Sequence, residues 1–175
     1  MGLERFAIIV VVACGGGESA PVVCGQGEMF DIAGPEDLDE LFGCTELAGS
    51  LRFGDTQLAA IDGLEALRVV DGTVNLFRNP NLVDLSGLRN LEIVRGELLV
   101  HHNDVLASAQ LPSVRVCGEL LVSSNASLSE LGLNDLATVE GDLRILGNRS
   151  LPQADAEAFA AGVDVGRTVL VEDNL

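Results

Sequence analysis

One phrase returns five times along the chain at a nearly constant interval, and this regularity constrains the fold more than any other feature. Each copy opens on a glycine, has apolar residues two and four positions later, and ends on a polar residue. The opening glycines are Gly49, Gly72, Gly96, Gly118 and Gly141. Self-similarity at this period is typical of stacked repeats, each of which buries its apolar side only against its neighbours. The sequence therefore predicts a repeat solenoid with parallel sheets.

The alternation within each phrase predicts which side chains face the core. Side chains two apart on a strand share a face. The predicted inward residues are Leu51, Phe53, Val74, Leu76, Leu98, Val100, Leu120, Val122, Leu143 and Ile145. Glycine at the start of each phrase permits either a positive φ or a close approach between neighbouring repeats.

Asparagines occupy one equivalent corner of four successive repeats. An inward asparagine can donate and accept hydrogen bonds at once, and so satisfies backbone groups that would otherwise be buried without partners. We predict a ladder through Asn79, Asn103, Asn125 and Asn148, with Asp55 in the same place in the first repeat. The alternative is that these asparagines mark exposed turns.

The amino-terminal residues are typical of an export signal. The apolar run from Phe6 to Ala13 is too short to span a bilayer, which takes about 20 residues, but it suits a secretory signal. Val11–Cys14 resembles a bacterial lipobox, so we predict a signal peptide at 1–13, a lipid on Cys14 and a flexible tether at 14–21. We expect an exported, lipid-anchored protein of the cell envelope, at the outer membrane. The alternative is a start codon placed upstream of an ordinary domain.

The other cysteines then fall into two kinds. In an exported protein, Cys24 and Cys44 are expected to form a disulfide, which would stabilise the fold by about 3 kcal/mol. Cys117 follows Val116 in an apolar run, which favours a buried free thiol.

The last repeat departs from the pattern. Residues from Leu151 to Gly162 predict a short helix, with Pro152 near its start and Gly162 at its end. A final strand in residues 168–175 restarts the phrase. Either this strand is the carboxy-terminal cap, or further chain once followed it.

The net charge of −17 argues against nucleic acid or an anionic membrane surface as a partner. Excess acid keeps a protein soluble and monomeric. We therefore expect a monomer that meets the membrane only through its lipid anchor.

The stretch from Cys24 to Phe53 resembles the opening of receptor L domains, the ligand-binding modules of the insulin and epidermal growth factor receptors. The resemblance includes C-G-x-G at Cys24, a helical run ending at Leu38–Leu41, and Cys44-Thr45. It extends over residues 22–175 and implies a single-stranded right-handed β-helix, leucine-rich-repeat-like, with an amino-terminal capping helix tied down by a Cys24–Cys44 bridge. A single such domain is present here rather than a pair around a cysteine-rich module, so the resemblance implies binding but not receptor signalling.

Outward positions of the strands supply the candidate binding residues. In receptor L domains a sheet face of this kind contacts protein ligands, and apolar groups on such a face suggest an interaction patch. The candidates are Phe77, Leu99, His101, Leu121 and Leu146. The alternative is that the face is covered by the chain itself or by a neighbour.

Other outward groups suggest weaker possibilities. Glu97, Glu119 and Asp142 share one row and could hold a cation such as calcium, but they could equally be solvated or relieved by Arg144. His101 and His102 are neighbours on a strand, so we expect them to point to opposite sides, with His102 at the corner. We predict no metal and no cofactor.

The chain has no nucleophile elbow and no His-Glu-x-x-His motif, and the repeat accounts for its glycines. We therefore expect a recognition module for a protein or glycan ligand and not an enzyme. Two alternatives stay open: a structural envelope protein that associates with copies of itself, and a β-helix enzyme acting on polysaccharide.

Overall fold

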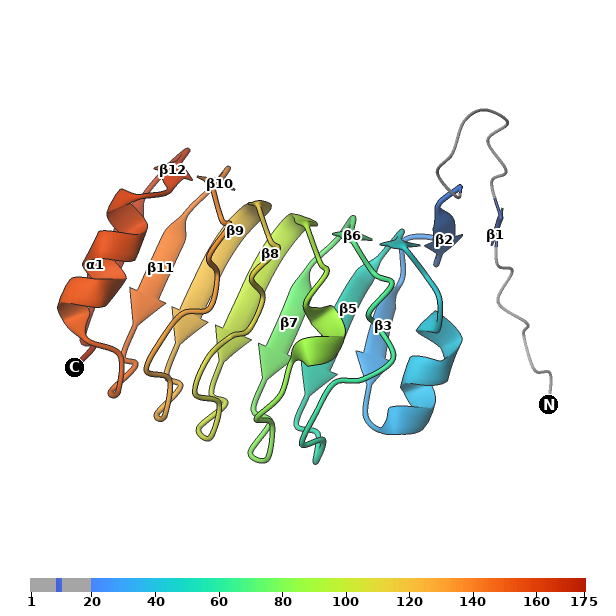
Figure 1. Ribbon diagram of the computed structural model, residues 1–175, viewed down its shortest axis with the longest axis horizontal. Helices are drawn as coiled ribbons and strands as arrows, with labels where there is room; N and C mark the ends of the chain where they lie inside the picture. Colours follow the sequence, from blue (N-terminus) through green and yellow to red (C-terminus); the bar gives the residue numbers. More distant parts are fainter. Residues whose placement is uncertain (1–8, 11–19) are drawn as a thin grey trace.

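The computed structural model describes residues 9–10 and 20–175 (Figure 1). The predicted cleavage site and the lipid-bearing Cys14 lie outside the described residues. The fold is a mostly parallel β-sheet with few helices, as the repeat predicts, and the sheet does not close on itself. Its strands follow one another across Figure 1 in nearly the order of the chain.

A long row of parallel strands carries the repeated phrase. Neighbouring strands pair without offset, so that Leu51 lies beside Val74, Val74 beside Leu98, and so on to Val169. The row consists of β3 (Met29–Ile32), β5 (Ser50–Gly54), β7 (Val74–Phe77), β8 (Ile93–His101), β9 (Val116–Ser123), β11 (Leu143–Leu146) and β13 (Val169–Glu172).

A second row of shorter strands runs beside the first. It consists of β2 (Val22–Cys24), β4 (Glu46–Leu47), β6 (Val69–Val70), the first residues of β8 and β9, β10 (Thr138–Val139) and β12 (Asp164–Val165). The two rows join in β8 and β9, where the register shifts between Val94 and Glu97. β1 (Ile9–Val10) pairs with β2 and is antiparallel to it.

Helical segments stand at the two ends of the stack (Figure 1). The expected amino-terminal helix is a short 3-10 helix, η1 (Pro35–Leu41), which buries Leu38 and Leu41. The Asp37 carboxylate accepts hydrogen bonds from the N–H groups of Ala33 and Gly34 at its start. At the other end α1 (Gln153–Ala161) confirms the predicted helix. A further 3-10 turn, η2 (Ser86–Leu88), lies between β7 and β8.

The core has the predicted alternation. All ten predicted inward side chains are at most 1% exposed. The corner glycines are required by close approach and not by φ, since Gly96 and Gly118 are not among the residues with positive φ. A Cβ on Gly96 would lie 2.7 Å from the carbonyl carbon of Gly72, and one on Gly118 would lie 2.6 Å from the Gly96 oxygen.

The four corner asparagines are fully buried and form one hydrogen-bonded row. In each, the backbone N–H and the side-chain amide both donate to the Oδ1 of the asparagine in the next repeat. The same amide also donates to a strand carbonyl, as from Asn125 Nδ2 to the oxygen of Val100 at 2.9 Å. Asn174 continues the row beyond Asn148.

The first position of this row corrects the prediction. Thr56, not Asp55, occupies it: the Thr56 N–H and Oγ1 donate to Asn79 Oδ1 at 3.1 and 2.8 Å. Asp55 is exposed and has a φ of +56°. Thr56 stands seven residues after its opening glycine, as Asn79 does. The register of the repeat therefore places Thr56, and not Asp55, in the row.

A side chain from the preceding turn ends the row. Gln153, at the start of α1, accepts at Oε1 from the N–H and Nδ2 of Asn174 and donates from Nε2 to the oxygen of Val171 at 2.9 Å. These are the bonds that a further asparagine would make. Gln153 therefore takes the place of the next asparagine in the row.

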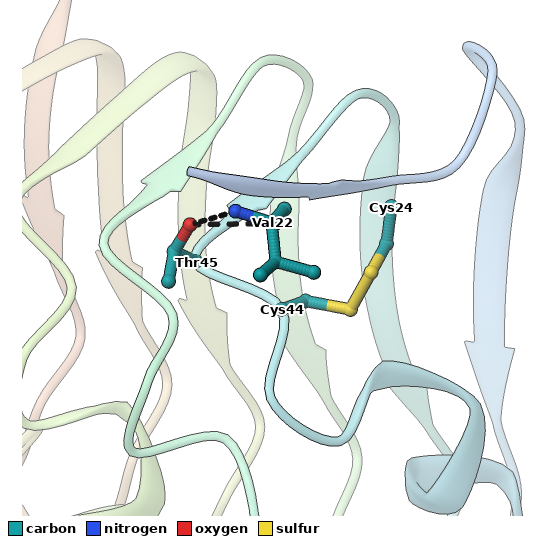
Figure 2. The surroundings of a disulfide bond; sticks show 4 residues. All are labelled: Val22, Cys24, Cys44 and Thr45. Atoms are coloured by element: carbon teal, nitrogen blue, oxygen red, sulfur yellow. Dashed lines mark hydrogen bonds between the residues drawn. A yellow bond between two sulfur atoms is a disulfide. The ribbon is translucent and has the colours of Figure 1, made fainter. Parts of the chain in front are cut away.

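Cys24 and Cys44 form the predicted disulfide, with their Cα atoms 5.9 Å apart (Figure 2). Beside it the Val22 N–H donates to Thr45 Oγ1 at 2.8 Å, and that hydroxyl donates back to the Val22 oxygen. The bridge therefore fastens β2 to the segment that follows η1. Cys117 is a buried free thiol, as predicted, and burial raises its pKa to about 12.

Candidate ligand-binding face

The side chains that alternate with the buried ones form a second face of the long row, which we call the outer face. It comprises the outward residues of β5, β7, β8, β9, β11 and β13. Because the strands pair without offset, these residues form three rows that run across the strands. Each row has a different chemical character.

The middle row supplies the apolar part of the outer face. Leu99 pairs with Leu121, and Arg144 stands between Leu121 and Leu170. Both candidate leucines, Leu99 and Leu121, are half-buried, whereas their inward neighbours are at most 1% exposed. The described chain therefore leaves this pair of leucines partly open to solvent.

The row at the carboxyl ends of the strands holds the other candidates. Phe77 pairs with His101 rather than with Leu99, so it lies one row away from the leucines. Ser123 separates His101 from Leu146 in the same row. The candidate residues thus share the outer face but do not form one continuous apolar patch.

Phe77 is the centre of an aromatic and cationic cluster. Its ring stacks on His101 with centroids 4.6 Å apart, and the Arg78 guanidinium carbon lies 4.6 Å from the Phe77 centroid. His101 Nε2 is 3.1 Å from the Oδ1 of Asn75. Burial lowers the pKa of His101, and the nearby His102 and Arg78 lower it further. Cations over an aromatic ring are attracted by its quadrupole, so Phe77 helps to hold Arg78 in place.

The two histidines are not on opposite sides, which corrects the prediction. His102 has a φ of +59°, so the strand alternation ends at His101. The rings meet edge to face with centroids 5.6 Å apart, and their Nδ1 atoms are 3.4 Å apart. His102 does lie at the corner, as expected.

The row at the glycine end is acidic. Glu97 pairs with Glu119, and Arg144 Nη2 contacts Glu119 at 3.2 Å and Asp142 at 3.3 Å. Arg144 therefore relieves part of the repulsion between these carboxylates. Among the residues that the structure describes, no group of three or more His, Cys, Asp or Glu side chains is arranged to hold a metal ion.

Sequence reasoning missed Asn75 and Arg78. Asn75 stands at the same outward position as Leu99, which could have been found by extending that row to the first strands. Arg78 has a φ of +52°, and its local sequence does not indicate that its guanidinium lies over the Phe77 ring.

The sequence model of the family described as Receptor L domain matches residues 43–159 of the chain. The chain therefore belongs to the receptor L domain family. Receptor L domains are in general modules that bind protein ligands. The match includes every strand from β4 to β11 and therefore most of the outer face. The C-G-x-G motif at Cys24 and the η1 segment precede it.

Neither the curated proteins nor the solved structures contain a match to this chain. Within residues 9–10 and 20–175, no helix is long and apolar enough to cross a membrane.

Proposed function

We propose that this receptor L domain is a recognition module that binds a protein ligand on its outer face. One observation carries the proposal: Leu99 and Leu121 lie side by side, partly open, on a face that contributes nothing to the core. The acidic row on one side and the cluster around Phe77 on the other supply polar groups that would select and orient the ligand. The mechanism is passive, because a rigid sheet presents a fixed pattern of groups.

We infer that the repeats wind as a single-stranded right-handed β-solenoid with η1 as its amino-terminal cap. The two parallel rows, the in-register strands and the buried asparagine row support this description. Such a scaffold is rigid because every repeat packs on both of its neighbours.

The lipoprotein setting is part of the same proposal. Residues 1–13 would be the signal peptide, Cys14 the lipid-bearing residue and residues 14–21 the tether. The Cys24–Cys44 disulfide supports export, since disulfides persist mainly in oxidising compartments. The tether would hold the domain, residues 22–175, at the cell envelope, on the outer membrane.

We further propose that the domain has no catalytic activity and acts as a monomer. A structural protein that associates with its own copies is the second candidate. Sedimentation separates the two, because a structural protein forms larger species as its concentration rises, whereas a recognition module without its ligand stays monomeric.

The function is tested by replacing both leucines with serine, Leu99→Ser and Leu121→Ser, in the soluble domain. We expect the free energy of unfolding to change by about 1 kcal/mol or less, as for surface positions, while capture of partner proteins from the parent cell's envelope is lost. Val83→Ser with Val105→Ser is the matched control, because both valines are exposed but lie outside the outer face. If the leucine variant captures the same partners as this control, the outer face is not the binding site.

A further inference from the structure

A hollow of about 290 Å³ lies at the turns that follow β8, β9 and β11. Its walls are His102 and Asp104 on one side and Arg149 on the other. The repeat between them contributes only Ser124 and Ala126, and Gly147 completes the lining. Small residues in the middle therefore create the hollow. Since strands are about 4.8 Å apart, the His102 and Arg149 turns are separated by about 10 Å. That span leaves room for one small polar group between them.

The arginine that lines this hollow, Arg149, forms no ion pair with any residue that the structure describes. In the part of the chain that the structure describes, Arg52, Arg68, Arg95, Arg115, Arg144 and Arg167 form ion pairs, whereas Arg78, Arg89 and Arg149 do not. The carboxylate of Asp104 shares the hollow with Arg149 without pairing to it. Arg149 is thus an unpaired guanidinium in a protein with 27 acidic residues.

The free groups in the hollow are mainly hydrogen-bond donors. Arg149 offers a planar guanidinium, and the Ser124 hydroxyl has no hydrogen bond within residues 20–175. His102 also lines the hollow, but its ring lies against Phe77 and His101, so we assign it no bond to the ligand. A guanidinium and a hydroxyl that line the same small space match a carboxylate, and hydrogen bonds to an ionised acceptor are the strong kind.

We propose that this hollow takes the carboxylate of a Glu or Asp side chain on the protein ligand. The inference rests on the proposed function, because Leu99 and Leu121 lie on β8 and β9, and the turns that follow these two strands line the hollow. Asp104 at the wall and the net charge of −17 disfavour a polyanion, so the hollow selects one acid next to apolar residues rather than an acidic run.

The probe is a pair of short peptides that differ in one group: acetyl-Leu-Glu-Leu-amide and acetyl-Leu-Gln-Leu-amide. Each is titrated into the full chain labelled with ¹⁵N, and the amide signals of Ser124 and Gly147 and the Arg149 Nε–H signal are followed. We expect saturable shifts with the Glu peptide and at least tenfold weaker binding of the Gln peptide. Equal binding of the two peptides would overturn the proposal.

Two arginine variants provide the control within the protein. Arg149→Gln should weaken binding of the Glu peptide about tenfold or more, because it removes the charged donors. Arg89→Gln should leave binding unchanged: Arg89 also has no ion pair, but it donates to the Ser86 oxygen beside η2, away from the hollow. An unchanged backbone spectrum shows that both variants are folded. Equal losses in the two variants would contradict the assignment.

Failure here and failure of the proposed function give different results. If the leucine variant loses its partner while the two peptides bind equally, the outer face stands and the carboxylate site is rejected. If the peptides are discriminated and the leucine variant keeps its partner, the carboxylate site stands and the proposed binding face is rejected. A stronger response to glucuronate than to the Glu peptide would overturn the assignment to a protein ligand.

Discussion

At the residue scale, single side chains decide what the outer face can offer. Phe77 was a candidate apolar anchor, yet its ring is in contact with His101 and Arg78. Its contribution is therefore to hold cationic and polar groups in place at least as much as to bind apolar surface. The partly open apolar groups are instead Leu99 and Leu121. In the middle row Leu99 is flanked by Asn75, and Leu121 is flanked by Arg144.

The burial of His101 predicts a pH dependence. Its pKa lies below the ordinary value of 6.5, so the unfolded chain binds a proton at higher pH than the folded protein does. Stability should therefore fall as the pH drops from about 6.5 towards the folded pKa, and change no further from this group below it. The midpoint of the His101 ring signals in an NMR titration should lie below 6.5, and His102→Gln should raise it. A His101 midpoint at or above 6.5 would contradict this account.

At the element scale, the asparagine row joins the turns that end successive strands. Each member donates forward and also satisfies a strand carbonyl, so removal of one side chain orphans groups in two repeats. Thr56 and Gln153 end the row with side chains that copy the asparagine bonds. The row therefore has a partner for its polar groups at both ends.

We predict that Asn125→Ala lowers the free energy of unfolding by about 3 kcal/mol. The substitution leaves buried donors of Asn103 without an acceptor, and each such group costs about 1–3 kcal/mol. Gln153→Ala, at the partly exposed end of the row, should cost less. The control is Asn134→Ala at an exposed site, which should change stability by about 0.5 kcal/mol or less. Denaturant melts measure all three, and equal losses at positions 125 and 134 would mean that the row does not stabilise the fold.

At the scale of the whole molecule, the residues that stabilise the fold are different from the residues that we propose bind the ligand. The core consists of aliphatic layers held by the sheet, by the buried asparagines and by the Cys24–Cys44 disulfide at the amino-terminal end. The outer face and the adjoining hollow are free to carry recognition, because neither contributes to inward packing.

The proposed anchor is also tested on the whole molecule. Cys14→Ser should abolish labelling with radioactive palmitate in the parent cell and release the protein from the membrane fraction. Cys117→Ser is the matched control and should keep both the label and the membrane location, because that thiol is buried in the core. Membrane retention of the Cys14 variant equal to wild type would contradict the lipoprotein assignment.

By itself, the sequence determined the features that repeat. The spacing of the glycines predicted parallel strands in register, and the alternation of apolar and polar residues predicted the ten buried positions. Both the repeat period and this alternation can be recognised in short stretches of sequence. The buried Cys117 and the helix after Leu151 followed from equally local signals, whereas the Cys24–Cys44 bridge was predicted from the expected export and the family resemblance. The family resemblance, which the match over residues 43–159 confirms, rests on the same regular spacing.

Only the tertiary structure decided where the irregular side chains lie. His102 and Arg78 turn towards Phe77 because their φ angles are positive, and the sign of φ at a non-glycine residue is set by the turn that the stacked repeats impose. Gln153 replaces an asparagine because α1 begins beside the last turn, and the hollow beside Arg149 exists because the preceding repeat contributes only Ser124 and Ala126 to its lining. Apart from Arg78 on Phe77, these contacts join residues about one repeat apart, and such a distance carries no local pattern from which they could be inferred.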